Sequence, residues 1–243
     1  MKIKSVLLTL FVAAGIWAID GNEILKKMDL NRTWKSIVST AKMEIIVDQE
    51  VRVKTMEISS LSEGNRSIVR FTNPEDEGTK YLMLGDNLWI YFPEENDVVK
   101  ISGHMLKEGM MGSDVSYEDA LEADKLAEKY DVAVTGEEAM DGHDCYLLTL
   151  TAKVKDAPYF KRVMWVEKKR FIAWKEELFA KSGKKLKASR VLSVKEIGTM
   201  WYPVKVEMVN MLRKNSKTVF TIDSITIDKP LSEELFTMRN LRR

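Results

Sequence analysis

A serine and three carboxylates lie close together near the middle of the chain, and such a group could in principle do chemistry. Ser113 and Asp114 are adjacent, and Glu118 and Asp119 follow shortly after them. An enzymatic interpretation would take Ser113 as the nucleophile of a lipid hydrolase. However, Ser113 does not occupy a Gly-x-Ser-x-Gly turn, and nothing in the sequence orients the two histidines of the chain. We assign no catalytic residue and keep lipid hydrolysis as the alternative function.

Helix capping explains the same residues more simply. Ser116 can accept a hydrogen bond at the start of a helix, and Asp119 can complete a capping box as a shorter substitute for Glu. The acidic residues then lie in the first turn, where the helix dipole favours them. Their spacing fits no EF-hand loop, and we expect neither a metal ion nor a cofactor. The pattern predicts a helix from Ser116 to Lys129.

Alternation of apolar and polar residues dominates the rest of the sequence and predicts strands with one buried face. A change of phase between Phe220 and Ile227 predicts a bulge near Asp223 and Ser224. Further helical signals occur at Asn22 to Leu30, where Asn22 could cap the helix, and after Ser232. We expect a mainly β fold of about ten antiparallel strands with a few helices.

Such a sheet must cover its apolar face. It can close into a barrel, fold into a sandwich or curl around helices. The predicted helices are too short to cover all the strands, so a concave apolar surface could remain for a ligand.

The segment after Gly85 contains an aromatic strand followed by a stretch rich in Met and Gly. The strand 88–93 has no polar face, which predicts burial on both sides or a cover resting on it. Unbranched Met side chains adapt to irregular apolar shapes, so residues 104–112 could form a flexible apolar lid. An ordinary core-packing loop is the equal alternative. The candidate ligand-binding residues are Trp89, Tyr91, Met105, Leu106, Met110 and Met111.

The N-terminus predicts export. Residues 1–18 combine Lys2 and Lys4 with a short apolar run and small residues that suit a cleavage site, as in a cleavable signal peptide. The run is shorter than the roughly 20 residues that cross a bilayer. Cys145 is the only cysteine, so no cysteine near the cleavage region could carry a lipid anchor. We expect residues 19–243 to form a single soluble domain.

The charges of this domain are distributed unevenly. Residues 19–142 contain 14 basic and 26 acidic residues, whereas residues 143–243 contain 22 basic and 11 acidic residues. The two halves could neutralise each other within one sheet. Alternatively, the Lys-rich stretches 168–170 and 181–187 could meet anionic headgroups or an acidic partner. We expect no nucleic-acid binding, because basic and aromatic motifs are not interleaved.

Two motifs resemble those of the LolA-like outer-membrane lipoprotein-sorting proteins. In that family a Trp-x-Tyr-x-Pro strand precedes a Gly-Ser-Asp-Phe-Ser-Tyr-Glu-Asp segment. Val115 stands in place of the usual Phe, a conservative change. The matching residues are Trp89, Tyr91 and Pro93 in the first motif, and Gly112, Ser113, Asp114, Ser116, Tyr117, Glu118 and Asp119 in the second.

This resemblance implies an incomplete, strongly curved antiparallel β-barrel of about ten or eleven strands, with helices plugging its concave side. It implies a non-enzymatic periplasmic carrier that binds acyl chains of a lipoprotein or phospholipid in an apolar cavity and transfers them toward the outer membrane. A membrane transporter or an outer-membrane acceptor would be its partner, and we expect a monomer.

Overall fold

The computed structural model describes residues 19–122 and 126–243, so the predicted signal peptide lies outside the described residues. The described strands are β1 Ser36–Val47, β2 Glu50–Leu61, β3 Arg66–Phe71, β4 Lys80–Leu84, β5 Asn87–Phe92, β6 Asp97–Ile101, β7 Tyr130–Met140, β8 His143–Ala152, β9 Lys161–Glu167, β10 Ala173–Phe179, β11 Lys185–Ile197, β12 Met200–Asn210 and β13 Ser216–Ile227. The α-helices are α1 Gly21–Asp29, α2 Tyr117–Leu121, α3 Leu126–Lys129 and α4 Met238–Leu241. Short 3-10 helices are η1 Leu30–Arg32, η2 Pro74–Asp76, η3 Gly103–Lys107, η4 Met110–Gly112 and η5 Glu233–Phe236. Across these ranges no helix has the length and apolar character needed to span a bilayer.

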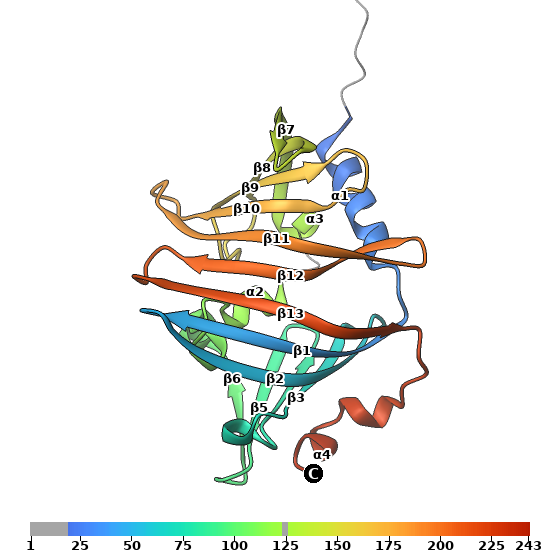
Figure 1. Cartoon of the computed structure of the whole chain (residues 1–243), viewed down its shortest axis with the longest axis vertical. Coiled ribbons are helices and arrows are strands. Elements are labelled where there is room, and N and C mark those ends of the chain that lie inside the picture. Colours follow the sequence, from blue (N-terminus) through green and yellow to red (C-terminus); the bar gives the residue numbers. More distant parts are fainter. Residues whose placement is uncertain (1–18, 123–125) are drawn as a thin grey trace, which may run out of the picture.

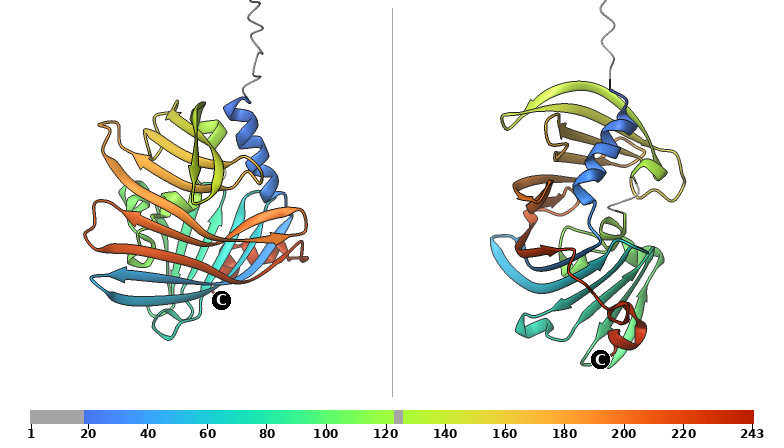
Figure 2. Two further views of the ribbon diagram at one scale, coloured as in Figure 1. Left: turned by 45° about the horizontal axis from the view of Figure 1, so that its top comes forward. Right: turned by 90° about the vertical axis from the view of Figure 1, so that its right-hand side faces the viewer.

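The strands form one curved antiparallel sheet in the order β6-β5-β4-β3-β2-β1-β13-β12-β11-β10-β9-β8-β7 (Figure 1). The first strand therefore pairs with the last, and two meanders extend from this central pair. β6 and β7 are the two edges and do not pair, so the sheet curls without closing (Figure 2). This agrees with the predicted incomplete barrel.

The described sheet has 13 strands, more than the ten or eleven expected. Several hairpins turn on only two residues, such as Asp48–Gln49 between β1 and β2 or Gly198–Thr199 between β11 and β12. Such short turns barely interrupt the alternation of the sequence, so neighbouring strands are easily counted as one.

The structure confirms two features that the sequence predicted from neighbouring residues, a β-bulge and a helix cap. The register of β1 against β13 shifts after Thr40, which pairs with Ser224, while Ala41 pairs with Ile222. The extra residue is Asp223, so the predicted bulge is confirmed. Ser232 caps η5 as expected, because its side chain accepts from the backbone of Glu234.

The start of α1 differs from the prediction. The helix begins at Gly21 after Asp20, rather than at a cap on Asn22. A Cβ on Gly21 would lie 2.8 Å from Cγ1 and 3.1 Å from the carbonyl oxygen of Val132 in β7. This close approach of helix and strand decides the start, and a capping preference alone does not reveal it.

Two apolar clusters line the inner face of the sheet. The first inner core joins β1 to β6 and includes Met43, Phe71, Tyr81 and Ile90. The second inner core joins α1 to β7, β8 and β9 through residues such as Ile24. Helices α1, α2 and α3 thus pack on the concave side, as expected, whereas α4 does not.

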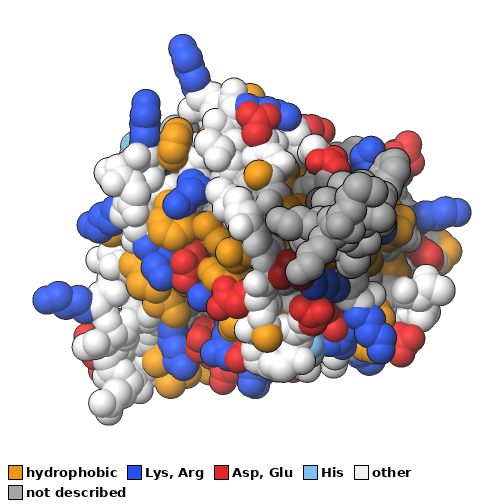
Figure 3. Space-filling model, turned by 90° about the horizontal axis from the view of Figure 1, so that it is seen from above, with side chains coloured by type: hydrophobic (Ala, Val, Ile, Leu, Met, Phe, Trp, Pro, Cys, Tyr) orange, Lys and Arg blue, Asp and Glu red, His pale blue; other side chains and the backbone are white. Residues whose placement is uncertain are grey.

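Two further clusters lie on the outer face. Phe236 and Leu241 of the C-terminal segment cover Ile68 and Leu82. On the other half, Cys145 is fully buried beside Trp165 and other aromatic residues. Seen from above, hydrophobic side chains alternate with charged ones rather than forming one continuous patch (Figure 3).

Candidate functional site

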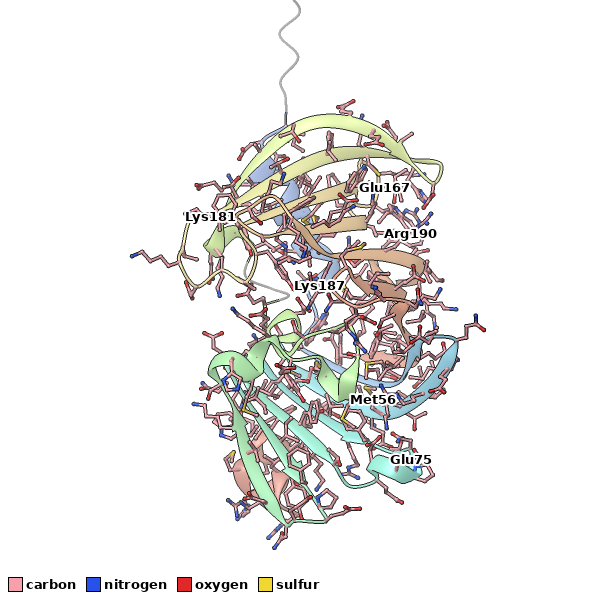
Figure 4. All side chains as sticks on the ribbon, turned by 90° about the vertical axis from the view of Figure 1, so that its left-hand side faces the viewer. Met56, Glu75, Glu167, Lys181, Lys187 and Arg190 are labelled. Atoms are coloured by element: carbon pink, nitrogen blue, oxygen red, sulfur yellow. The ribbon has the colours of Figure 1, made fainter. Side chains whose placement is uncertain are left out.

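The connection between β6 and β7 determines the geometry of the inner face. Because these strands are opposite edges of the sheet, residues 102–129 must cross from one half to the other. This crossover segment carries η3, η4, α2 and α3, and it contains the second family motif. Figure 4 shows it lying between the two halves of the sheet, with Lys187 reaching toward it.

A cavity of about 700 Å³ lies between the helices and the inner face of the sheet. Residues of α1, α2 and α3 line one side, and residues of β9 to β12 line much of the other. Among the apolar lining residues are Leu25, Met28, Leu121, Met164, Val206 and Met208. The cavity is therefore bounded by the sheet and by short helices, and its lining is more apolar than polar, with charged residues such as Glu122 and Glu128 in it.

Two charged side chains of the cavity wall, Arg162 and Glu176, form an ion pair. Nε of Arg162 lies 2.6 Å from Oε1 of Glu176. Burial by itself lowers the pKa of Arg162, but the adjacent Glu176 carboxylate outweighs burial and raises that pKa. The guanidinium stays protonated, and the Glu176 carboxylate neutralises its charge.

Asp114 fastens the crossover segment to β13. Its carboxylate is almost fully buried and accepts hydrogen bonds from the hydroxyls of Ser216, at 2.8 and 2.9 Å, and Thr218, at 2.9 Å. The backbone N–H of Asp114 donates to the Thr218 hydroxyl at 2.9 Å. This family-motif residue therefore holds two distant parts of the chain together.

Ser113 also takes part in hydrogen bonds that hold the crossover segment in place. Its buried side chain donates to the carbonyl of Val115 at 3.1 Å. Nη1 of Arg213, in the turn between β12 and β13, donates to the carbonyls of Gly112 at 3.0 Å and Ser113 at 2.8 Å. These contacts fix the backbone of the motif.

Asp119 forms the second attachment. It accepts hydrogen bonds from the backbone N–H and the hydroxyl of Ser116, both at 2.7 Å, and completes the predicted capping box of α2. The Tyr159 hydroxyl donates to it at 2.6 Å, and Nζ of Lys187 in β11 lies 2.5 Å away. Burial, and next the Asp119 carboxylate, raise the pKa of Tyr159, so the phenol remains a donor.

The other two motif residues of α2 face different surroundings. The ring of Tyr117 packs against that of Tyr81 in the first inner core, with 6.0 Å between the ring centroids. Burial, and next the neighbouring Asp119, raise the pKa of the Glu118 carboxyl. Glu118 therefore carries its charge at an unfavourable position.

The predicted lid residues Met105, Leu106, Met110 and Met111 pack together on the first inner core. They lie beside the large cavity rather than among its lining residues. Their segment has a defined conformation, since a Cβ on Gly109 would lie 2.0 Å from the carbonyl oxygen of Ser113. We call residues 105–111 the lid segment.

The first family motif lies on the outer face. Side chains alternate along β5, so Leu88 and Ile90 enter the first inner core while Trp89 and Tyr91 pack toward the C-terminal segment. Both faces of this strand are covered, as expected. However, the structure separates Trp89 and Tyr91 from the cavity that the sequence placed them beside. Pro93, after the strand, lies 3.4 Å from the Cβ position of Gly78.

Sequence reasoning missed the partners of the motif carboxylates. Lys187 belongs to a run of lysines that looked exposed, yet it is only 7% exposed. Tyr159 precedes β9, and Thr218 belongs to β13. A charged residue at an inward position of a strand was the available signal, but its partner lies 68 residues away in the chain.

Comparison with known proteins identifies the class. The fold resembles that of a DUF1329 family protein from Desulfovibrio piger, with a TM-score of 0.86, 28% identity, and coverage of 91% of this chain and 97% of that one. A second similar structure is a domain from Vibrio parahaemolyticus described as outer membrane lipoprotein-sorting. Its TM-score is 0.83 at 25% identity, and the match covers 92% of this chain and 98% of that one. A LolA superfamily protein from Nitrosomonas europaea has a TM-score of 0.76 at 23% identity, and the match covers 92% of this chain and 100% of that one. The chain has the LolA-like fold, as its motifs indicated.

Residues 63–243 match the model of a family described as "Uncharacterized protein". The chain belongs to that family. No curated protein matches it.

The attachment at Asp119 predicts an order of stabilities. Asp119→Ala leaves the Lys187 ammonium buried without its carboxylate, and breaking a buried ion pair in this way costs about 3–5 kcal/mol of unfolding free energy. Lys187→Met should cost less, because the carboxylate keeps donors from Ser116 and Tyr159. Urea unfolding measures both, with Asp131→Ala at an exposed position of β7 as the control. The reverse order would contradict this assignment.

The raised pKa of Glu118 predicts a pH dependence. A carboxyl with a higher pKa in the folded state binds more protons when folded, so its contribution to the free energy of unfolding increases as the pH falls from 7 through that pKa. Glu118→Gln should therefore be more stable than the wild type at pH 7, and the difference should shrink toward pH 4.5. Urea unfolding midpoints at both pH values measure it. The exposed Glu57→Gln should not reproduce the trend.

Proposed function

We propose that the protein is a non-enzymatic carrier that encloses acyl chains of a lipid or lipoprotein. The observation that carries the proposal is the apolar cavity of about 700 Å³ between the helices and the inner face of an unclosed sheet. Its volume lies within the roughly 300–1,000 Å³ of pockets that enclose small ligands. A ligand there would contact side chains from both halves of the chain.

The energetics of burial suit such a carrier. Each methylene that leaves water contributes about 0.8 kcal/mol, so about ten methylenes supply roughly 8 kcal/mol, which corresponds to micromolar binding. No covalent step is required. The ion pair of Arg162 with Glu176 neutralises these two charges of the wall, and apolar contact would supply the binding energy.

The comparisons support this proposal. One of the similar structures is described as an outer membrane lipoprotein-sorting domain, and it covers nearly the same length. Together with the predicted signal peptide, this favours a periplasmic carrier that delivers cargo toward the outer membrane, to an acceptor there or from a membrane transporter. The surroundings of Ser113 give no support to the alternative lipid hydrolase, because the hydroxyl is buried and bonded to the Val115 carbonyl.

Filling the cavity should remove the cargo. In Val206→Trp, a larger side chain on β12 would occupy part of the cavity, and we expect at least a tenfold loss of co-purifying acyl lipid or lipoprotein. Native mass spectrometry of protein purified from its own envelope would measure this. Lys205→Trp, on the opposite face of the same strand, is the matched control.

Two results would overturn the carrier. One is wild-type protein that never carries an acyl compound, and the other is turnover of a defined lipid that Ser113→Ala abolishes. A Val206→Trp variant that keeps its full cargo would instead remove this cavity from the proposal.

We further propose that the lid segment moves when cargo enters. The four apolar residues of this segment are only partly buried, and they adjoin α2, which lines the cavity. Met111 has a φ of 52°, a strained value for a residue other than glycine. Opening would relieve this strain while exposing apolar surface that an acyl chain could cover.

A lid variant tests this role. Met110→Asp with Met111→Asp should slow or weaken uptake of a fluorescent fatty acid at least fivefold, because charged side chains remove apolar contact with the chain. Met110→Gln with Met111→Gln should show a smaller effect, and His104→Asp, exposed in η3, should show none. Unfolding curves would verify that the variants fold. Unchanged uptake in the folded aspartate variant would refute the lid.

A further inference from the structure

Exposed apolar side chains gather at one edge of the molecule. Of the eight large hydrophobic residues that are clearly exposed in the described chain, only Leu30 and Leu192 lie elsewhere. The others are Val51, Val53, Val154, Phe160, Met211 and Leu212. Leu212 is 58% exposed and Val51 is 54% exposed. Single exposed hydrophobics are ordinary, but six at the start of β2, in the β8–β9 connection and in the β12–β13 turn need an explanation.

Hydrogen bonds show that these turns adjoin one another. The backbone N–H of Asp48, between β1 and β2, donates to the carbonyl of Asn215, between β12 and β13, at 3.1 Å. The backbone N–H of Met211 donates to the carbonyl of Leu186, at the start of β11, at 2.8 Å. The N–H of Phe160, just before β9, donates to the carbonyl of Phe179 at the end of β10 at 3.0 Å. The hairpin turns of β1–β2, β10–β11 and β12–β13 lie at the left of Figure 1, and this edge faces the viewer in Figure 4.

The same edge is basic along three of its segments, although the β1–β2 turn adds the exposed Asp48 and Glu50. Segments 153–161, 180–185 and 211–217 contain nine Lys or Arg residues and a single acidic residue, Asp156. Within the described residues, Lys155, Lys181, Lys184 and Lys214 form no ion pair with a carboxylate, and all four are exposed. Lys181 projects into solvent in Figure 4. We call residues 51–53 together with these three segments the docking rim.

We propose that the docking rim binds the surface of an anionic phospholipid bilayer, with its apolar tips in the interfacial layer and its lysines against the headgroups. Exposed apolar residues beside a polybasic surface are the combination that interfacial binding requires. Long lysine side chains can reach the headgroups while their stems cover apolar surface.

The position of the rim fits a bilayer better than a protein partner. The exposed apolar side chains are carried separately by the start of β2, the β8–β9 connection and the β12–β13 turn, whereas a protein interface usually buries a continuous apolar core. Arg213 of the rim also holds the carbonyls of Gly112 and Ser113, so the rim is joined directly to the crossover segment beside the lid. A protein docked by this edge would present that segment to the membrane.

This inference goes beyond the proposed carrier function. Membrane binding can be measured without cargo, so the membrane-binding proposal and the carrier proposal can each fail independently of the other. Val206→Trp should keep membrane binding, and variants of the rim should keep any lipid held in the cavity.

Co-sedimentation of the mature protein with vesicles tests the proposal. Binding is expected to vesicles of phosphatidylglycerol with phosphatidylethanolamine, to be weak with phosphatidylcholine, and to decrease between 50 and 500 mM salt, which screens the headgroup charges. Lys181→Glu with Lys184→Glu and Lys214→Glu should weaken binding roughly hundredfold at low salt. A control with the same charge change, Lys26→Glu with Lys169→Glu and Lys195→Glu, alters exposed lysines outside the rim and should bind nearly as the wild type.

The apolar tips are tested separately. Phe160→Ser with Leu212→Ser should weaken binding at least fivefold without changing the charge, whereas Leu30→Ser with Leu192→Ser should not. Absence of binding to anionic vesicles would overturn the proposal, as would equal losses in the rim and control lysine variants. Self-association that the rim variants abolish, without vesicle binding, would overturn it in favour of an interface between copies.

Discussion

The separation of β6 and β7 at opposite edges of the sheet is the constraint on which the rest of the structure depends. Consecutive strands in an antiparallel sheet are usually neighbours, but these two are joined by a segment that must cross the open concave side. The segment packs apolar residues such as Met105, Met110 and Tyr117 on the first inner core, and two carboxylates attach it as well. Asp114 holds it to β13, and Asp119 holds it to β11 through Lys187. Buried ion pairs contribute little net stability, but the two carboxylates favour this arrangement because their buried partners would otherwise be left unpaired.

This crossing divides the inner face into two regions with different properties. Over β1 to β6, the lid segment completes an apolar core that is otherwise well filled. Under α1, α2 and α3, beside β9 to β12, the helices are too short to fill the available space, and a cavity remains. A sheet that curls without closing thus provides one wall of the cavity, and short helices provide the other.

The uneven distribution of charge in the sequence has two outcomes in the structure. Part of it is neutralised between the halves, as in the ion pairs of Lys187 with Asp119, Arg190 with Asp141 and Lys168 with Glu137. Within the described chain, the lysines of the docking rim are not among the residues whose charge is neutralised between the two halves. The stretch 168–170, by contrast, lies at the other end of β9 and is engaged with Glu137, Asp144 and Glu167. Two lysine-rich stretches that look alike in sequence therefore differ in what they can bind.

The sequence by itself determined the features that depend on near neighbours. The capping box of Ser116 and Asp119, the bulge at Asp223, the cap at Ser232 and the family motifs were all legible, because each depends on residues a few positions apart. Only the tertiary structure decided which face of β5 enters the first inner core, that Lys187 is buried and that segments from different regions form one edge. A strand pattern fixes which residues share a face, but not which face is inside. That choice depends on the pairing of β1 with β13 and on a crossover of 28 residues, whose contacts lie far apart in the chain.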